Sequence, residues 1–225
     1  MKPKYNRQTS IINIEQFREN LISIVGCGAN GSFIAVALAK MGLTKFYLWD
    51  FDKVEPHNLP NQFFGEKDIG MNKARATGIY MQNFNSDCSI CYFEKFSKNN
   101  YPKNDIKLPS PQIMISCVDK MSVRKEIFEC CKNDKKVQLF IDTRMGGLQG
   151  QIYFIDMNNK EQVENYEKTL FGDDEAVQQR CTERSIIYTV MGIASLVCNQ
   201  IVKAFKKEEI ANYIVLDFTI PQLMI

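Results

Sequence analysis

The sequence predicts an α/β fold: a doubly wound, mostly parallel sheet whose C-terminal strands run antiparallel. Two observations lead to this prediction. Short apolar runs alternate with helix-like stretches along most of the 225 residues. One apolar run also leads into Gly26-x-Gly28-x-x-Gly31, and the next run ends in the acid Asp50. This order of strand, glycine turn, helix, strand and acid is typical of a Rossmann-like nucleotide-binding unit.

The first half of the chain is predicted to form three strands and two helices after an N-terminal arm or short helix over residues 1–20. Gly42 is a C-terminal stop signal for the first helix, and prolines and a glycine indicate turns between residues 53 and 70. Five apolar residues recur at helical spacing in that helix: Phe33, Ile34, Ala37, Leu38 and Met41. The predicted strands cover residues 21–26, 44–50 and 89–93, and the predicted helices cover 31–42 and 72–83.

The second half begins with a polar loop over residues 97–111, which holds three prolines. Residues 157–184 are charged and weakly periodic, so we expect an exposed crossover segment there. Apolar runs separated by polar residues predict the remaining elements. The predicted strands cover residues 112–117, 137–142, 150–156 and 213–218, and the predicted helices cover 123–132 and 186–203.

The composition is that of a globular domain, with 45% hydrophobic and 24% charged residues. A net charge of +2 gives no reason to expect nucleic acid or a membrane surface as a partner. No apolar stretch approaches the ~20 residues that span a bilayer. The N-terminus lacks the apolar core of a signal peptide. We therefore expect a cytoplasmic protein whose eight cysteines are reduced.

The glycine turn and the acid that follows it predict a nucleotide site. The glycines let the turn close and let backbone amides approach phosphate at a helix N-terminus. An acid at the end of the next strand can hold a ribose hydroxyl. These residues alone leave open whether the nucleotide is a dinucleotide redox cofactor or ATP, and a tight turn without a ligand is the plain alternative.

Two segments after the second strand are more specific. Residues 50–63 read Asp-Phe-Asp-Lys-Val-Glu-Pro-His-Asn-Leu-Pro-Asn-Gln-Phe, and residues 68–74 read Asp-Ile-Gly-Met-Asn-Lys-Ala. They resemble the ThiF/MoeB family, which adenylates ubiquitin-like and sulfur-carrier proteins and has the patterns Asn-Leu-x-Arg-Gln and Asp-Ile-Gly-x-x-Lys. Residues 5–8, Tyr-Asn-Arg-Gln, match the family's opening motif, and residues 116–119 match its strand-end acid, with Arg124 beyond. The resemblance covers residues 5–150 well and the rest loosely.

The resemblance implies a single ThiF-type adenylation domain over residues 1–225 that uses ATP and Mg²⁺. In such a domain the C-terminal carboxylate of a small ubiquitin-like or sulfur-carrier protein attacks the α-phosphate. An acyl-adenylate and pyrophosphate are the products. The resemblance also implies a homodimer in which Arg7 acts as an arginine finger on the partner subunit.

Individual residues take their roles from the same resemblance. Asp50 would hold the ribose hydroxyls, Lys73 would hold phosphate as a point charge, and Asp119 would ligate Mg²⁺. The backbone of the glycine turn would contact phosphate through Gly26, Gly28, Ala29, Asn30 and Gly31. The pocket lining would be completed by Asp52, Asn58 and Gln62. Each role has a plain alternative: a helix cap, a solvated lysine, a turn-forming acid or a surface arginine.

One position departs from the family pattern. Asn61 stands where the family has an arginine that contacts phosphate. A neutral amide does not replace the planar, permanently charged guanidinium fork. Arg75 or Arg144 could compensate; without compensation, adenylation would be slow or altered, or the chain would bind nucleotide without turnover.

Cys181 is the candidate nucleophile. It lies between Arg180 and Arg184, just before a long apolar helix, and both features favour a thiolate. In ubiquitin-activating relatives a cysteine followed by threonine accepts the activated carrier as a thioester. Cys181 is therefore either an acyl acceptor or an exposed thiol without a catalytic role.

Residues 142–148 would either shape a channel for the carrier tail or form an ordinary strand–turn–strand connection.

Three other functions stay open at this stage. The same superfamily could activate a peptide or a tRNA carboxylate. The glycine pattern also suits an NAD(P)-dependent oxidoreductase, although such an enzyme does not need the segments at residues 58–62 and 68–73. A non-catalytic nucleotide-binding scaffold is the third alternative, suggested by Asn61.

Overall fold

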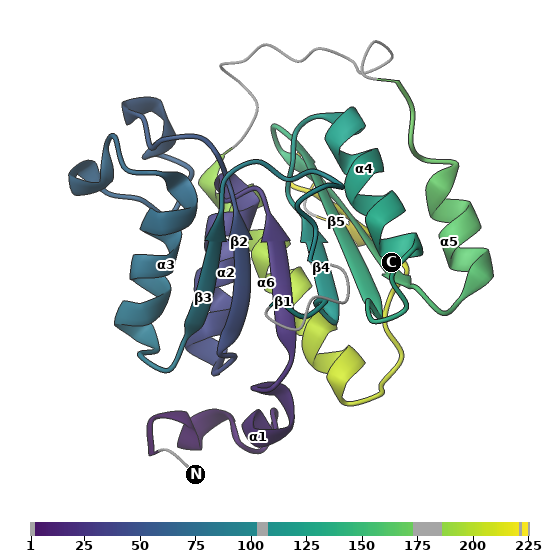
Figure 1. The fold of residues 1–225 in the computed structure, drawn as a ribbon, viewed down its shortest axis with the longest axis horizontal. Coiled ribbons are helices and arrows are strands. Elements are labelled where there is room, and N and C mark those ends of the chain that lie inside the picture. Colours follow the sequence, from purple (N-terminus) through teal and green to yellow (C-terminus); the bar gives the residue numbers. More distant parts are fainter. Residues whose placement is uncertain (1–2, 103–107, 173–185, 221, 225) are drawn as a thin grey trace.

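Eight strands form one sheet in the order β3-β2-β1-β4-β5-β6-β7-β8 in the computed structural model (Figure 1). It describes residues 3–102, 108–172, 186–220 and 222–224. The first five strands run parallel, and β6, β7 and β8 continue the sheet antiparallel, which confirms the predicted architecture. The strands are β1 (Leu21–Val25), β2 (Lys45–Trp49), β3 (Ser89–Phe93), β4 (Ile113–Ser116), β5 (Leu139–Gly146), β6 (Gln149–Asp156), β7 (Tyr213–Asp217) and β8 (Gln222–Met224).

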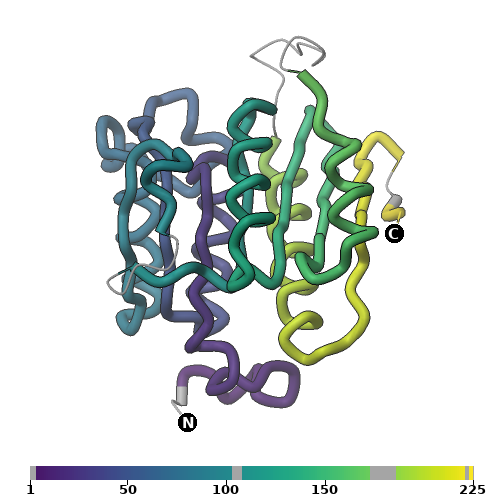
Figure 2. Tube along the Cα trace, turned by 45° about the vertical axis from the view of Figure 1, so that its right-hand side comes forward, coloured from purple at the N-terminus to yellow at the C-terminus, as the bar shows by residue number. Residues whose placement is uncertain are grey.

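Helices cover both faces of the sheet (Figures 1 and 2). One face carries α2 (Ala29–Met41), α3 (Lys73–Phe84) and α6 (Ile187–Phe205), and the other carries α4 (Met121–Lys132) and α5 (Lys160–Glu167). Short helical turns complete the described elements: η1 (Pro3–Gln8), α1 (Ile14–Phe17), η2 (Pro56–Asn58) and η3 (Glu66–Asp68).

The covering of both faces explains why the central strands are mainly apolar. In β1, Ile22 and Ile24 face the core below α2 and α6, whereas Leu21 and Val25 face the core below α4. All five residues of β1 are buried. A strand that is buried on both faces has an apolar sequence without the alternation of a half-exposed strand.

Of the segment expected to be exposed, residues 157–184, the structure describes residues 157–172. Residues 160–167 form α5, and most of its side chains are exposed as expected. Tyr166 is the exception, because only 1% of its surface is exposed and its ring packs against Phe128 and Phe140. Residues 173–185 of this segment lie outside the described residues.

α6 corrects the expectation that no apolar stretch approaches membrane-spanning length. Its 19 residues have a mean hydropathy of 1.3 and meet that criterion by length and composition. The helix packs against α2 and the sheet, and nine of its residues are buried. A helix that lies inside a core is also expected to be strongly apolar, so this feature has a structural explanation.

The strand order places a topological switch point between β1 and β4, where ligands bind in doubly wound sheets. The loop after β1 closes very tightly there. Gly26 has a φ of +91°, and a Cβ on it would lie 2.7 Å from the carbonyl oxygen of Cys117. A Cβ on Gly31 would lie 1.8 Å from the carbonyl oxygen of Gly26. These two glycines are therefore required by the close approach of backbone segments.

The glycine loop gives a prediction about stability. We expect Gly31→Ala to lower the free energy of unfolding by about 2–4 kcal/mol, because the added methyl group collides with a backbone atom that cannot rotate away. Gly28→Ala is the matched control, since its Cβ would meet only the Gln62 side chain, at 3.9 Å. We expect its effect to stay within about 1 kcal/mol. Urea unfolding followed by circular dichroism measures both; equal losses would contradict the prediction.

Candidate active site

The strands β1, β2 and β4 end at one edge of the sheet, and β5 crosses the same edge before it continues to Gly146. The sheet register aligns Trp49 with Val25, Val25 with Ser116, and Ser116 with Asp142. The residues that follow each of these in the chain therefore lie at the same edge of the sheet: Asp50, Gly26, Cys117 and Thr143. Most of the predicted site residues lie on this edge or on the loops that follow it.

Asp50 joins the end of β2 to the glycine loop. Its two carboxylate oxygens accept hydrogen bonds from the backbone N–H groups of Cys27, at 2.7 Å, and Asp52, at 2.9 Å. Burial raises the pKa of Asp50 above its usual value, and these two hydrogen bonds offset part of the shift. Each carboxylate oxygen keeps a further lone pair, so Asp50 can also accept a ligand hydroxyl.

Lys73 and Asp52 form an ion pair beside the glycine loop. The Lys73 Nζ lies 3.1 Å from Asp52 Oδ2, and the Lys73 backbone N–H donates to the Asp52 carbonyl at 2.9 Å. The lysine side chain is 11% exposed and the Asp52 side chain is 51% exposed. Lys73 is thus a nearly buried cation whose partner faces solvent, an arrangement that suits recognition of a second anion.

The start of α2 offers an anion site. Gly28 is its N-cap and no side chain caps this helix end, so its first backbone N–H groups are available to a ligand. The Asn30 side-chain amide donates to Thr143 Oγ1 at 3.2 Å. The buried Oδ1 of Asn30 and the buried Oε1 of Gln62 have no hydrogen-bond partner among the described residues. Unsatisfied buried acceptors of this kind are costly unless a ligand supplies a donor.

Asn58 has a structural role in this arrangement. Its buried side chain accepts a hydrogen bond from the Glu55 backbone at 2.9 Å and closes the turn η2. The Asn58 carbonyl in turn accepts from the Gln62 backbone N–H at 2.9 Å. Asn58 thereby holds Gln62 close to Gly28.

Asp119 is exposed on the loop between β4 and α4, three residues beyond the end of β4. Among the described residues, no group of three or more His, Cys, Asp or Glu side chains could hold a metal ion. Mg²⁺ at nucleotide sites is commonly held by one or two carboxylates together with phosphate oxygens. The carboxylate donor of Asp119 fits that chemistry when a nucleotide supplies the remaining oxygens.

One predicted catalytic residue, Arg7, is not brought to this edge. Arg7 is exposed on η1, which docks at the opposite end of α2, where Gln8 Nε2 donates to the Met41 carbonyl at 2.8 Å. The 13 residues of α2 separate η1 from the glycine loop by ~20 Å. Arg7 therefore does not reach the site of its own chain. Cys181 lies outside the described residues.

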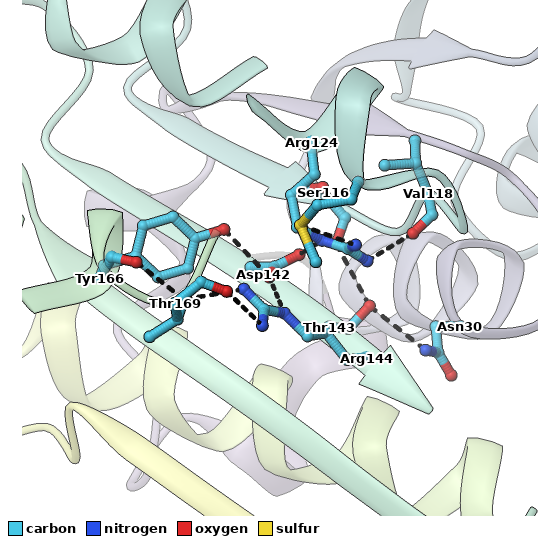
Figure 3. A network of polar contacts seen from close by, with 10 residues as sticks. Asn30, Ser116, Val118, Arg124, Asp142, Thr143, Arg144, Tyr166 and Thr169 are labelled. Atoms are coloured by element: carbon cyan, nitrogen blue, oxygen red, sulfur yellow. Dashed lines mark hydrogen bonds and ion pairs between the residues drawn. The ribbon is translucent and has the colours of Figure 1, made fainter. Parts of the chain in front are cut away.

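A buried charge network that the sequence did not predict lies on the face of the sheet that α4 covers (Figure 3). Asp142 is fully buried, and its Oδ1 lies 2.6 Å from Nε of Arg124. Its Oδ2 lies 2.8 Å from Nε of Arg144 and 3.0 Å from the hydroxyl of Tyr166. A signal was present, because Asp142 directly follows a short apolar run in the sequence, and a buried charge must find partners. Tyr166 gave no such signal, since it lies in a segment expected to be exposed.

The network excludes Arg144 as a replacement for the arginine missing at Asn61. Besides Asp142, its guanidinium donates to the Thr169 carbonyl and hydroxyl at 3.2 and 3.0 Å. Arg75 is exposed, and its guanidinium lies 5.7 Å from the centre of the Tyr92 ring. Residues 142–146 form the second half of β5, and residues 147 and 148 make the tight turn into β6, with a φ of +58° at Gly147.

The thiols beside the glycine loop are poor nucleophiles. Burial raises the pKa of Cys27 well above its usual value and that of Cys117 to about 12. A thiol with such a pKa is almost fully protonated at neutral pH. Neither residue is therefore suited to nucleophilic catalysis.

Asp50 gives a prediction about pH. Because its folded-state pKa is raised, the folded chain keeps a proton on Asp50 where the unfolded chain has already lost it. The stability from this group is therefore present at low pH and is lost as the pH rises through the folded-state pKa. Relative to Asp50→Asn, we expect the wild-type free energy of unfolding to fall as the pH rises from about 3.9, the usual pKa of an aspartate, toward neutrality. Urea unfolding of both chains across this range measures the difference; a rise would contradict the prediction.

About two thirds of this chain is similar to curated proteins of one name. Ubiquitin-like modifier-activating enzyme 5 of Bombyx mori is 30% identical over 159 residues, which cover 66% of this chain and 40% of the relative. The same enzyme of Caenorhabditis elegans is 25% identical over 160 residues, 67% of this chain and 38% of the relative. The chain thus spans about two fifths of the length of these relatives.

Solved structures show the same fold. E. coli MccB with ATP superposes with a TM-score of 0.74 and 18% identity, covering 100% of this chain and 71% of that one. PaaA superposes with a TM-score of 0.76 and 19% identity, covering 98% of this chain and 80% of that one. A family model described as the ThiF family matches residues 5–221. The chain therefore belongs to the ThiF family.

Proposed function

We propose that this chain uses ATP to adenylate the C-terminal carboxylate of a small ubiquitin-like or sulfur-carrier protein. Its membership of the ThiF family supports this, as does its similarity to proteins named ubiquitin-like modifier-activating enzyme 5. The observation that carries the proposal is the grouping of Asp50, Lys73 and the uncapped start of α2 at the switch point of the sheet. An oxidoreductase would not need the buried lysine.

The proposed reaction is a displacement at phosphorus. A carboxylate oxygen of the carrier bonds to the α-phosphorus of ATP, and the bond from that phosphorus to the oxygen bridging to the β-phosphate breaks. Pyrophosphate leaves with the electron pair. Lys73 and the N–H groups of α2 would stabilise the charge on the phosphates, and Asp50 would orient the ribose. Asp119 would hold Mg²⁺, which supplies further charge neutralisation when bound.

A second step would transfer the carrier to Cys181. Its thiolate sulfur attacks the acyl carbon, the bond from that carbon to the adenylate oxygen breaks, and AMP leaves. The flanking Arg180 and Arg184 favour the thiolate. The thiols at the glycine loop do not offer this chemistry, because burial raises the pKa of Cys27 and Cys117.

We also propose that the active unit is a homodimer. Arg7 is exposed and lies ~20 Å, the length of α2, from the glycine loop of its own chain. As an arginine finger it would have to act on the site of a second copy. The proposed dimer gives this exposed side chain a role that it does not have within one chain.

Pyrophosphate exchange tests the proposed activity. The chain is incubated with ATP, labelled pyrophosphate, Mg²⁺ and candidate carriers that end in Gly-Gly. We expect label to enter ATP only when the matching carrier has a free C-terminal carboxylate, because reversal of adenylation requires the acyl-adenylate. The same carrier with an amidated C-terminus is the control.

The outcomes separate the alternatives. ATP binding without exchange for any carrier or peptide would contradict the proposal and favour a scaffold, and NAD binding without ATP binding would favour an oxidoreductase. Exchange with a short peptide alone would overturn the carrier-protein assignment.

Two variants test the proposed residue roles in the same assay. Asp119→Asn should lower pyrophosphate exchange, whereas Cys181→Ala should keep exchange and lose the reductant-sensitive carrier conjugate. A conjugate that survives Cys181→Ala would contradict the thioester step.

Mixing two inactive variants tests the proposed dimer. Arg7→Ala lacks the finger and Asp119→Asn lacks the metal ligand, but a mixed dimer has one complete site. After subunit exchange at equal amounts we expect about a quarter of the wild-type exchange activity. Arg7→Ala mixed with the double variant Arg7→Ala/Asp119→Asn is the control, because no complete site can form. Activity of Arg7→Ala alone at the wild-type level would contradict the role of Arg7.

A further inference from the structure

We propose that Arg124 is a positioning residue that fixes the loop carrying Asp119, and that Asp142 is the buried anchor that holds Arg124 in place. The inference rests on the proposed role of Asp119 at the nucleotide. It concerns two buried residues that lie side by side, Arg124 from α4 and Asp142 from β5 (Figure 3).

The contacts of Arg124 run in two directions. Its Nε donates to Asp142 Oδ1 at 2.6 Å, and its Nη2 donates to the carbonyl oxygen of Val118 at 2.5 Å. Val118 directly precedes Asp119 in the chain. The exposed loop that carries Asp119 is therefore tied to the interior by the guanidinium group of Arg124, a residue that is only 4% exposed.

The other end of this link is rigid. Asp142 lies in the parallel core of the sheet, paired in register with Ser116 of β4. Its second oxygen, Oδ2, is held by Arg144 at 2.8 Å and by Tyr166 at 3.0 Å. Because the two oxygens serve different partners, the carboxylate cannot rotate toward Arg124 without breaking contacts on its other side. Arg124 is thus held in one orientation.

The shape of the side chain matters as well as its charge. An arginine presents several N–H donors in one plane and can hold a carboxylate and a carbonyl at once, whereas lysine is a point charge. Arg124→Lys therefore keeps the positive charge beside Asp142 and loses the simultaneous hold on Val118. A purely structural ion pair would affect stability alone, whereas a positioning role must also change how Asp119 meets a metal ion.

Binding measurements on the full chain separate these roles. The probe is a non-hydrolysable ATP analogue with a methylene group between its α- and β-phosphates, titrated calorimetrically with and without Mn²⁺. We expect Arg124→Lys to weaken the Mn²⁺-dependent part of binding by about tenfold, the effect typical of losing a residue that orients a metal ligand. Metal-free binding should be unchanged. Tyr166→Phe is the matched control: it removes one contact of Asp142 Oδ2, so we expect a lower melting temperature with wild-type Mn²⁺ dependence.

A double-mutant cycle decides the result. If Arg124 acts through Asp119, then Arg124→Lys should add no further loss of Mn²⁺-dependent binding to Asp119→Asn. Two outcomes would overturn the role of Arg124 but leave the proposed role of Asp119 intact. One is that the losses in the double variant are additive. The other is that Arg124→Lys keeps wild-type Mn²⁺-dependent binding while Asp119→Asn loses it. An Asp119→Asn chain with wild-type Mn²⁺ dependence would overturn the proposed role of Asp119 as well. If Arg124→Lys does not fold, Asp142→Asn takes its place in the cycle with the same expectation.

Discussion

The close approach of the β1 loop to the β4 loop is the constraint on which the rest of the site depends. Gly26 lies so near the Cys117 carbonyl that no side chain fits between them, and Gly31 meets the Gly26 carbonyl in the same way. This contact brings the start of α2 and the loop carrying Asp119 to one point. Asp50 then adds the end of β2, because it accepts the Cys27 N–H. A shift of any one of these segments would move the others.

A second group of interactions lies one strand further along the sheet and has a different character. Asp142 is a carboxylate without solvent contact, and a carboxylate in that position is tolerated only with charged, well-oriented partners. Arg124, Arg144 and Tyr166 provide them. Such a network adds little net stability compared with an apolar core, but removing one partner strongly lowers the free energy of unfolding, because it leaves a buried charge without a partner. The network instead fixes the positions of its members, and it links β5 in the core of the sheet to the loop before α4.

The sequence was sufficient for the architecture because the elements have strong local signals. The glycine turn, the apolar period of residues 31–42 and the stop at Gly42 each depend on neighbouring residues, and Gly42 indeed has a φ of +108° as a helix cap. Interactions between distant segments could not be predicted in this way. Arg124 and Tyr166 meet Asp142 only because α4 and α5 pack on the same face, and Asn30 meets Thr143 across 113 positions. The position of Arg7 far from the glycine loop likewise depends on how η1 packs.

The protonated state of Cys27 and Cys117 has a consequence for selectivity. An acyl-adenylate is a strong acylating agent, and any thiolate near it is a competing acceptor. Burial keeps both thiols beside the glycine loop protonated at neutral pH. In the proposed reaction, this arrangement would protect the site from acylation of its own nearest sulfur atoms and would leave the acyl group for a different acceptor.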